Sequence, residues 1–308
     1  MPQAHGSAQP KLIREVTART TILVTGARGQ LGYELARVLM PLGHVAALDR
    51  SSLDLSRTDD IGRTIDAIAP ALIINAAAYT AVDRAESERE QAFAVNAQAP
   101  AILAEYAQRR GAVLIHYSTD YVFDGAQRTP YDEEAAPNPL NVYGESKLAG
   151  ERAVLAASTQ AIVLRTSWVY SSRGSNFLLT MRRLAAERDE LRVVDDQFGV
   201  PNCARALADA TATLIGRGIP YLAQRAGLYH MSASGETTWY RFARAIVGER
   251  AKPRIVPITT AEYPTPARRP AYGVLDTRKF ERTFGFGLPT WQTALQSCVS
   301  QLPAITLS

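Results

Sequence analysis

The chain has 308 residues, of which 46% are hydrophobic and 21% are charged, a composition typical of a soluble globular protein. Its formal net charge of +4 comes without any dense basic run, so we expect no nucleic-acid partner. No segment is long and apolar enough to span a bilayer, and no signal-like apolar run follows the start, so we expect a cytoplasmic protein without a membrane partner. The two cysteines, Cys203 and Cys298, fit no disulfide framework or metal motif, and we expect both to be inert.

The first part of the chain predicts a phosphate-binding turn. Residues 1–19 are polar, lack a sustained hydrophobic period and predict a flexible extension without a function of its own. After them an apolar, β-branched run leads through Gly26, Gly29 and Gly32 into a helical pattern. Such a turn cradles phosphate, because glycines allow close approach and the N–H groups at the start of the helix point at the ligand.

A second strand pattern, residues 43–49, ends in an acidic residue. Asp49 follows Gly26 at about the 20-residue interval at which an acid binds the adenosine ribose of a dinucleotide. Its carboxylate should accept the 2′-hydroxyl and disfavour a 2′-phosphate, whereas the neighbouring Arg50 could offset that repulsion. The cofactor is therefore NADPH or NADH, with a leaning towards NADH.

Further strand patterns near Leu72, Val113 and Ile162 alternate with helical stretches, as in a parallel sheet covered on both faces. The strand over residues 112–119 ends in two hydroxyls, Ser118 and Thr119. Because parallel α/β sheets bind ligands at the carboxyl ends of their strands, we expect these hydroxyls to face a cofactor crevice.

Tyr143 and Lys147 lie four positions apart, so they share one face of a predicted helix. A cation held beside a phenol favours the phenolate and lowers its pKa, which would let the pair handle a proton. Taken alone, the spacing also fits an ordinary exposed helix pair. In combination with the glycine turn and Thr119, the Tyr143 and Lys147 spacing indicates a site for carbonyl chemistry at a nicotinamide.

From about Ser167 the pattern changes to helices at 176–187, 204–216 and 238–247 with short strands such as 227–231. We expect a dinucleotide-binding domain over 20–166. Residues 167–308 should form mainly a smaller α/β substrate-binding lobe, with some segments returning to the first domain. That lobe should close over the substrate.

Several motifs make the chain resemble the extended short-chain dehydrogenase/reductases, and within them the reductases of dTDP-4-dehydrorhamnose. The most specific are Ser-Thr-Asp-Tyr-Val-Phe at 118–123, Thr-Ser-Trp-Val-Tyr at 166–170 and Tyr-Pro-Thr-Pro-Ala at 263–267. The resemblance runs from about Thr21 to Leu302. It implies a Rossmann-like, doubly wound parallel sheet with the smaller C-terminal lobe described above.

The resemblance also implies a role for each matching residue. The catalytic residues would be Thr119, Tyr143 and Lys147. The cofactor-binding residues would be Gly26, Gly29, Gln30, Leu31, Asp49, Asp54, Leu55, Ala78, Tyr79, Thr80, Tyr143 and Lys147. The sugar would contact Val82, Thr119, Asp120, Tyr121 and Trp168, and Arg268 or Arg269 would lie near the diphosphate.

Some members of the family are described with magnesium held by glutamates at a dimer interface, so a homodimer is the assembly that the resemblance suggests. Glu34 and Glu187 match two of those positions, but Gln292 stands where a third glutamate is expected. A neutral amide is a weaker ligand for a hard cation. We therefore expect no metal site, and Glu34 should be a solvated helix residue.

The resemblance implies reduction of the C4 keto group of a small nucleotide-sugar, dTDP-4-dehydro-L-rhamnose, to dTDP-L-rhamnose. Two alternatives remain at this point. One is an epimerase or dehydratase of the same extended family, although a dehydratase should carry an acid pair where Asp120 is followed by Tyr121. The other is a regulatory subunit that binds a dinucleotide without catalysis.

Overall fold

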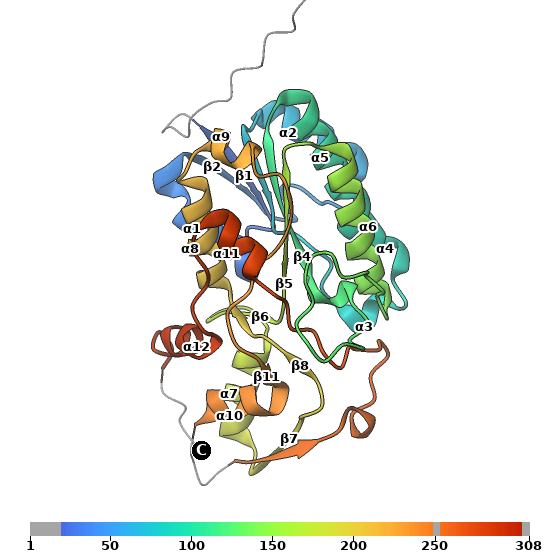
Figure 1. The fold of residues 1–308 in the computed structure, drawn as a ribbon, viewed down its shortest axis with the longest axis vertical. Coiled ribbons are helices and arrows are strands. Elements are labelled where there is room, and N and C mark those ends of the chain that lie inside the picture. Colours follow the sequence, from blue (N-terminus) through green and yellow to red (C-terminus); the bar gives the residue numbers. More distant parts are fainter. Residues whose placement is uncertain (1–19, 249–252, 304–308) are drawn as a thin grey trace, which may run out of the picture.

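The structure, a computed structural model, describes residues 20–248 and 253–303 (Figure 1). The flexible extension predicted over residues 1–19 lies outside the described residues. None of the described helices is both long and apolar enough to cross a membrane.

A sheet of six parallel strands forms the centre of the larger part of the molecule. Its strands, from one edge to the other, are β10 (Gly227–His230), β5 (Ala161–Thr166), β4 (Val113–Thr119), β3 (Leu72–Asn75), β1 (Thr21–Thr25) and β2 (His44–Leu48). The first five strands in chain order lie where the sequence predicts them. The strand expected in the lobe at 227–231 instead pairs with β5, because Tyr229 and Met231 belong to the hydrophobic cluster on one face of this sheet.

Alternate side chains of the strands pack under two layers of helices, as the pleat of a strand requires. Ile22 and Ile74 belong to one hydrophobic cluster, whereas Leu23 and Ile73 belong to another. The first face is covered by α1 (Gln30–Val38), α8 (Ala204–Ile215), α9 (Ile219–Ala223) and α11 (Arg278–Phe284). The second face is covered by α2 (Thr58–Ile68), α5 (Ala99–Arg110) and α6 (Val142–Ala157). The predicted doubly wound α/β fold is confirmed.

The order of the strands reverses at β1. The chain runs from β1 outward to β2, then returns to place β3 on the other side of β1. In open α/β sheets, ligands bind at such a reversal, outside the carboxyl ends of the strands. Short elements in the connections are η1 (Met40–Leu42), α3 (Val82–Ala85), α4 (Arg89–Phe93), the π-helical turn η2 (Ala94–Gln98) and η3 (Asp120–Val122).

A smaller lobe lies beyond one end of the sheet and has its own hydrophobic core (Figure 1). Its helices are α7 (Phe177–Glu187), α10 (Trp239–Val247) and α12 (Trp291–Val299), with the short η4 (Thr260–Glu262). Its strand pairs are β7 (Glu190–Val194) with β12 (Arg254–Ile258), β6 (Val169–Tyr170) with β9 (Asn202–Cys203), and β8 (Phe198–Gly199) with β11 (Thr237–Thr238).

Helices α7, α8 and α10 confirm the three helices that the sequence predicts after Ser167. Asn176 and Thr238 begin two of them, because each side chain accepts a hydrogen bond from a backbone N–H of the first turn. Four elements after residue 166, namely α8, α9, β10 and α11, pack with the central sheet. The domain boundary at residue 166 remains a prediction.

Candidate functional site

A cleft of about 550 Å³ opens at the carboxyl ends of β1, β2, β3 and β4, where the strand order reverses. All twelve residues that the sequence predicts for the cofactor line it. They are Gly26, Gly29, Gln30, Leu31, Asp49, Asp54, Leu55, Ala78, Tyr79, Thr80, Tyr143 and Lys147. The structure therefore brings this predicted set together, while the role of each residue remains a prediction.

The glycine turn after β1 is too tightly folded for side chains. Gly26 has a φ of 69°, and a Cβ there would lie 2.8 Å from the Ala77 Cα. A Cβ on Gly32 would lie 2.1 Å from the carbonyl oxygen of Gly26. The Gly29 N–H donates to that same carbonyl at 2.8 Å, so the turn closes on itself and α1 begins at Gln30, on the wall of the cleft.

At the end of β2, the Asp49 carboxylate accepts hydrogen bonds from Ser51 and Ser52. These bonds lower the pKa of Asp49 to about 2, so the group is ionised at neutral pH. Arg28 of the glycine turn forms an ion pair with Asp49 at 3.0 Å, and Arg50 pairs with Asp54 at 3.2 Å. Both guanidinium groups line the cleft, so the ribose end carries cations as well as acids.

Helix α6 presents Tyr143 and Lys147 to the cleft, one turn apart. The Asn141 side chain begins this helix by accepting from the Gly144 N–H at 2.8 Å. A Cβ on Gly144 would lie 2.2 Å from the carbonyl oxygen of Tyr121, so glycine lets α6 pack directly on the turn after β4. Its first turn is thereby held against Thr119 and Asp120.

The Tyr143 phenol is more weakly acidic than the sequence predicted. Burial raises its pKa to about 12, and the nearby Asp120 charge acts in the same direction, although a hydrogen bond with the Thr119 hydroxyl opposes both. The prediction that Lys147 lowers the pKa of Tyr143 is wrong for this structure. The Lys147 ammonium donates instead to the carbonyl oxygen of Tyr117 at 2.6 Å. Helix spacing predicts which residues share a face, but not where a long side chain points.

Beneath Lys147 lies a chain of fully buried polar side chains. The His116 Nε2 is 3.4 Å from the Lys147 Nζ, and the His116 Nδ1 is 3.0 Å from the Asn75 Nδ2. Thr25 donates to the Asn75 Oδ1 at 2.6 Å. Burial and the Lys147 charge hold the pKa of His116 well below its usual range, so the imidazole is neutral. Burial also lowers the pKa of Lys147 to about 8, with Glu151 acting in the opposite direction.

The turn after β4 packs three more predicted residues beside the phenol. The Thr119 hydroxyl donates to the Asp120 Oδ1 at 3.1 Å and accepts from the Tyr121 N–H at 3.2 Å. Asp120 is only 2% exposed, and burial raises the pKa of its carboxyl to about 7. The Tyr121 ring meets the Tyr143 ring edge to face at 5.7 Å between centroids.

Trp168, the residue predicted as a wall of the sugar pocket, lies outside the cofactor cleft and belongs to an aromatic stack. Its ring is 3.6 Å from that of Trp239, with 11° between the planes. Its φ of 42° is uncommon for a bulky residue, and a Cβ on Gly199 would lie 2.5 Å from the indole. Beyond Trp239, the lobe holds a cavity of about 400 Å³ that is also lined by Tyr263 and Arg269.

The comparisons with known proteins agree with this architecture. A family model described as the RmlD substrate binding domain matches residues 20–303. The chain is 47% identical to the dTDP-4-dehydrorhamnose reductases of Burkholderia thailandensis and Escherichia coli K12, over 91% of this chain and 98% and 97% of those proteins. The chain belongs to the dTDP-4-dehydrorhamnose reductase family. It is therefore an NAD(P)-dependent oxidoreductase.

Solved structures extend this relationship. A dTDP-4-dehydrorhamnose reductase from Bacillus anthracis, crystallised in complex with NADP, is 36% identical, with a TM-score of 0.86 over 92% of this chain and 99% of that one. A UDP-glucose 4-epimerase from Thermus thermophilus in complex with NAD has a TM-score of 0.76 over 91% of this chain and 98% of that one. At 19% identity, the epimerase shows a shared fold alone. The cofactor of this family is a nicotinamide dinucleotide.

In this member of the reductase family, the loop over residues 263–270 docks beside α3 and the start of α6. Arg269 forms an ion pair with Asp83 of α3 at 2.8 Å, and the Ala267 N–H donates to the same carboxylate at 3.1 Å. The Asn141 side chain donates to the carbonyl oxygen of Arg268 at 2.7 Å, while the Arg268 side chain is exposed. Val82, at the start of α3, is partly buried beside this junction.

The glutamates that match the family's metal positions are engaged elsewhere in this reductase. Glu34 was expected to be solvated, but it is only 7% exposed and lies 3.9 Å from Arg205, because α1 packs against α8. Glu187 pairs with Arg183 at 2.7 Å, and Gln292 is exposed on α12. Within residues 20–248 and 253–303, no three His, Cys, Asp or Glu side chains gather as a metal site would require.

The sequence predictions missed several residues of the site. Asn75 ends strand β3, and His116 lies in the middle of β4, where a histidine inside an otherwise apolar run was the available signal. Arg28 lies between two glycines of the predicted turn, where its pairing with Asp49 could have been anticipated. Trp239 gave no signal, because its partner Trp168 is distant in the sequence.

Proposed function

We propose that this chain uses NADPH or NADH to reduce the C4 keto group of dTDP-4-dehydro-L-rhamnose to dTDP-L-rhamnose, the last step of dTDP-rhamnose synthesis. The observation that carries the proposal is the meeting of Tyr143 and Lys147 in the cleft of the glycine turn, with Thr119 beside the phenol. Carbonyl reduction requires a hydride at carbon and a proton at oxygen. The reductases that are 47% identical to this chain bear the name of this activity.

The residues of the cleft fit a dinucleotide. The turn at Gly26 and the start of α1 suit a pyrophosphate, and the acid at Asp49 suits a ribose. Farther along the cleft, the buried hydroxyls of Ser118 and Thr166 have no hydrogen-bond partner among the described residues, so both could bind a polar ring substituent. When bound, a dihydronicotinamide supplies the hydride.

Tyr143 is the proton donor in this proposal. With a pKa of about 12, its phenol holds its proton at neutral pH and can pass it to the carbonyl oxygen of the substrate. The Thr119 hydroxyl lies beside the phenol and donates its one proton to the buried Asp120 carboxyl in the free protein. When the substrate is bound, that proton would turn from Asp120 to the same carbonyl oxygen and polarise it.

Lys147 would hold the cofactor ribose and supply a positive charge below the phenol. Its pKa of about 8 keeps it protonated at neutral pH. Two of its ammonium contacts are already made, to the Tyr117 carbonyl and to His116, which fixes its position inside the protein. A donor held in place before binding loses less entropy when it engages a ligand.

Cofactor preference follows from the charges around the ribose. Asp49 is ionised and should accept the hydroxyls of NADH. Arg28 and Arg50 flank the same place and could receive the 2′-phosphate of NADPH. We infer that both cofactors bind and that Asp49 favours NADH.

The nucleotide-sugar would lie between the cleft and the lobe. Tyr121, Asp120, Val82 and Trp168 are the residues we assign to the deoxysugar. The cavity beyond Trp239 has the aromatic and cationic lining that a nucleoside diphosphate requires. Arg269 borders this cavity, although Asp83 already neutralises its charge.

The alternatives within the extended family make a different prediction. An epimerase or dehydratase returns its hydride to the same sugar and therefore consumes no cofactor over a full turnover. A regulatory subunit would bind the dinucleotide without turnover. The intact Thr119, Tyr143 and Lys147 favour catalysis, and Tyr121 stands where a dehydratase should carry an acid.

The proposal is tested by mixing the purified protein with NADPH or NADH and enzymatically prepared dTDP-4-dehydro-L-rhamnose while absorbance at the nicotinamide band is recorded. We expect one equivalent of cofactor to be oxidised for each equivalent of dTDP-L-rhamnose formed. Conversion of the sugar without loss of absorbance would support the epimerase or dehydratase instead. Binding of cofactor without any sugar conversion would support the regulatory role.

A further inference from the structure

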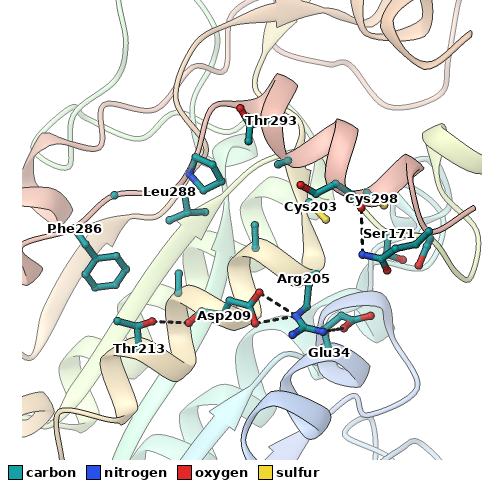
Figure 2. A pocket seen from close by; sticks show the side chains of 18 residues that line it. Glu34, Ser171, Cys203, Arg205, Asp209, Thr213, Phe286, Leu288, Thr293 and Cys298 are labelled. Atoms are coloured by element: carbon teal, nitrogen blue, oxygen red, sulfur yellow. Dashed lines mark hydrogen bonds and ion pairs between the residues drawn. The ribbon is translucent and has the colours of Figure 1, made fainter. Parts of the chain in front are cut away.

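A second cavity, of about 330 Å³, lies between α8, α12 and α1 and shares no lining residue with the cofactor cleft (Figure 2). Its wall includes both cysteines of the chain. Cys203 ends strand β9 and immediately precedes α8, and Cys298 lies in the last turn of α12. Figure 2 shows the two side chains side by side on the same part of the wall.

The two thiols interact with each other even though they are far apart in the sequence. Strand β9, which carries Cys203, packs against helix α12, which carries Cys298, and both side chains line the same cavity. The two side chains are only 6% and 4% exposed, respectively, and both are reduced. The sequence predicted two inert cysteines, and the structure places them as an adjacent pair beside a cavity.

The surroundings make the two sulfurs chemically unequal. Interaction with Cys298 lowers the pKa of Cys203, and the amides of Ala206 and Arg205 at the start of α8 act in the same direction, whereas burial and the Glu34 charge oppose the shift. The pKa of Cys298 is raised by its interaction with Cys203 and by burial. Cys203 is thus the more nucleophilic member of the pair at neutral pH.

We propose that Cys203 and Cys298 form an oxidative modification site, a dithiol that hydrogen peroxide converts into an intramolecular disulfide. The supporting geometry is the packing of α12 on β9, which places the two cysteines side by side, and the cavity that both of them line (Figure 2). The cavity is large enough for a peroxide molecule, which is only slightly larger than a water molecule.

The reaction proceeds in two balanced steps. The Cys203 thiolate attacks one oxygen of the peroxide, the O–O bond breaks, and a sulfenic acid forms with release of water after protonation. The Cys298 sulfur then attacks the Cys203 sulfur, its proton is lost, and the hydroxyl group leaves as water. Two thiols are oxidised by two electrons, and one peroxide is reduced to two waters.

The test uses the full-length protein, titrated with hydrogen peroxide at neutral pH, with no substrate present. Free thiols are counted after denaturation, and the non-reduced tryptic peptides are mapped by mass spectrometry. We expect both thiols to disappear together and one cross-linked peptide pair to join Cys203 to Cys298 within a single chain. Reductant should restore both thiols.

Matched serine variants separate the two roles. In Cys298→Ser, peroxide should leave Cys203 as a sulfenic acid that dimedone captures. In Cys203→Ser, Cys298 should remain a free thiol under the same treatment. If either variant folds poorly, the thiol count and the peptide map of the wild-type protein still test the proposal. Two thiols that resist peroxide, or that oxidise separately to sulfinic acids without a cross-link, would overturn the proposal.

Discussion

The cofactor cleft and the substrate side of the site are built in different ways. The cleft is formed by strand ends and by the first turns of the helices that follow them, so its residues recur at spacings that a sequence reveals. The side that we assign to the substrate is formed by contacts between distant segments, such as Trp168 on Trp239 and the 263–270 loop on α3. Local spacing therefore predicts which residues line the cleft, whereas the proposed sugar site depends on how the lobe packs.

Tyr143 stands where these two regions meet, and its replacement should have the largest effect. Tyr143→Phe keeps the ring and removes the proton donor, so turnover should fall by ~10²–10⁴-fold while the cofactor dissociation constant changes little. Steady-state kinetics and fluorescence titration with NADPH measure the two quantities. Tyr121→Phe, which removes the hydroxyl from the neighbouring ring of the edge-to-face pair, is the matched control and should retain far more turnover. A Tyr143→Phe enzyme that keeps most of its turnover would exclude Tyr143 as the acid.

His116 tests whether the buried side of the cleft positions Lys147. Removing a hydrogen bond to a charged group costs on the order of 10–100-fold, so His116→Ala should lower kcat/KM by that amount. His116→Gln, which retains a polar atom, should recover part of the loss.

The pH profile distinguishes this role from simple loss of structure. In the wild-type enzyme, Lys147 loses its proton as pH rises through its pKa of about 8, so kcat/KM should fall on the alkaline side. The contact with His116 supports the charged ammonium, so its loss in His116→Ala should lower this pKa further, and the alkaline limb should move to lower pH. An alkaline limb that stays in place would show that His116 does not act on Lys147.

Asp49 tests the ribose end of the cleft. Asp49→Ser removes the carboxylate that repels a 2′-phosphate and leaves Arg28 without its partner, so preference should move towards NADPH by ~10–100-fold. The ratio of kcat/KM values for the two cofactors is the measurement. Asp54→Ser, which changes the neighbouring acid paired with Arg50, is the control. An unchanged ratio in Asp49→Ser would place the ribose elsewhere.

Trp239 tests the substrate side, and a smaller effect is expected there. An aromatic pair contributes about 0.5–1.5 kcal/mol beyond its buried area, so Trp239→Ala should raise KM for the nucleotide-sugar roughly 3–10-fold. Affinity for the cofactor should not change, because Trp239 does not line that cleft. Trp239→Phe keeps a stacking ring and should restore most of the affinity. Equal losses for sugar and cofactor would mean that the lobe affects both regions alike.

Magnesium removal should have no effect on assembly. Gln292 replaces an expected acid, Glu34 lies near Arg205, and Glu187 pairs with Arg183. Light scattering with and without a chelator should therefore give the same particle mass, whatever that mass is. A dimer that dissociates on chelation and reforms with magnesium would return both glutamates to the set of ligands.

The sequence predicted the part of the site that depends on local spacing. The turn at Gly26, the acid at Asp49 and the Tyr143 and Lys147 pair all reach one cleft as expected. It predicted the wrong direction for the Tyr143 pKa, because burial and the orientation of Lys147 are set by packing. The pairing of Cys203 with Cys298 was equally inaccessible, since it depends on how α12 returns to β9.

The most direct test of the central claim follows the hydride itself. The enzyme would be supplied with NADPH or NADH that carries deuterium at the transferable position of the nicotinamide, together with dTDP-4-dehydro-L-rhamnose. The account predicts dTDP-L-rhamnose with deuterium at C4 and no label elsewhere, as read by NMR and mass spectrometry. Product that forms without deuterium at C4 would contradict it, because the chain would then not reduce the sugar from its cofactor.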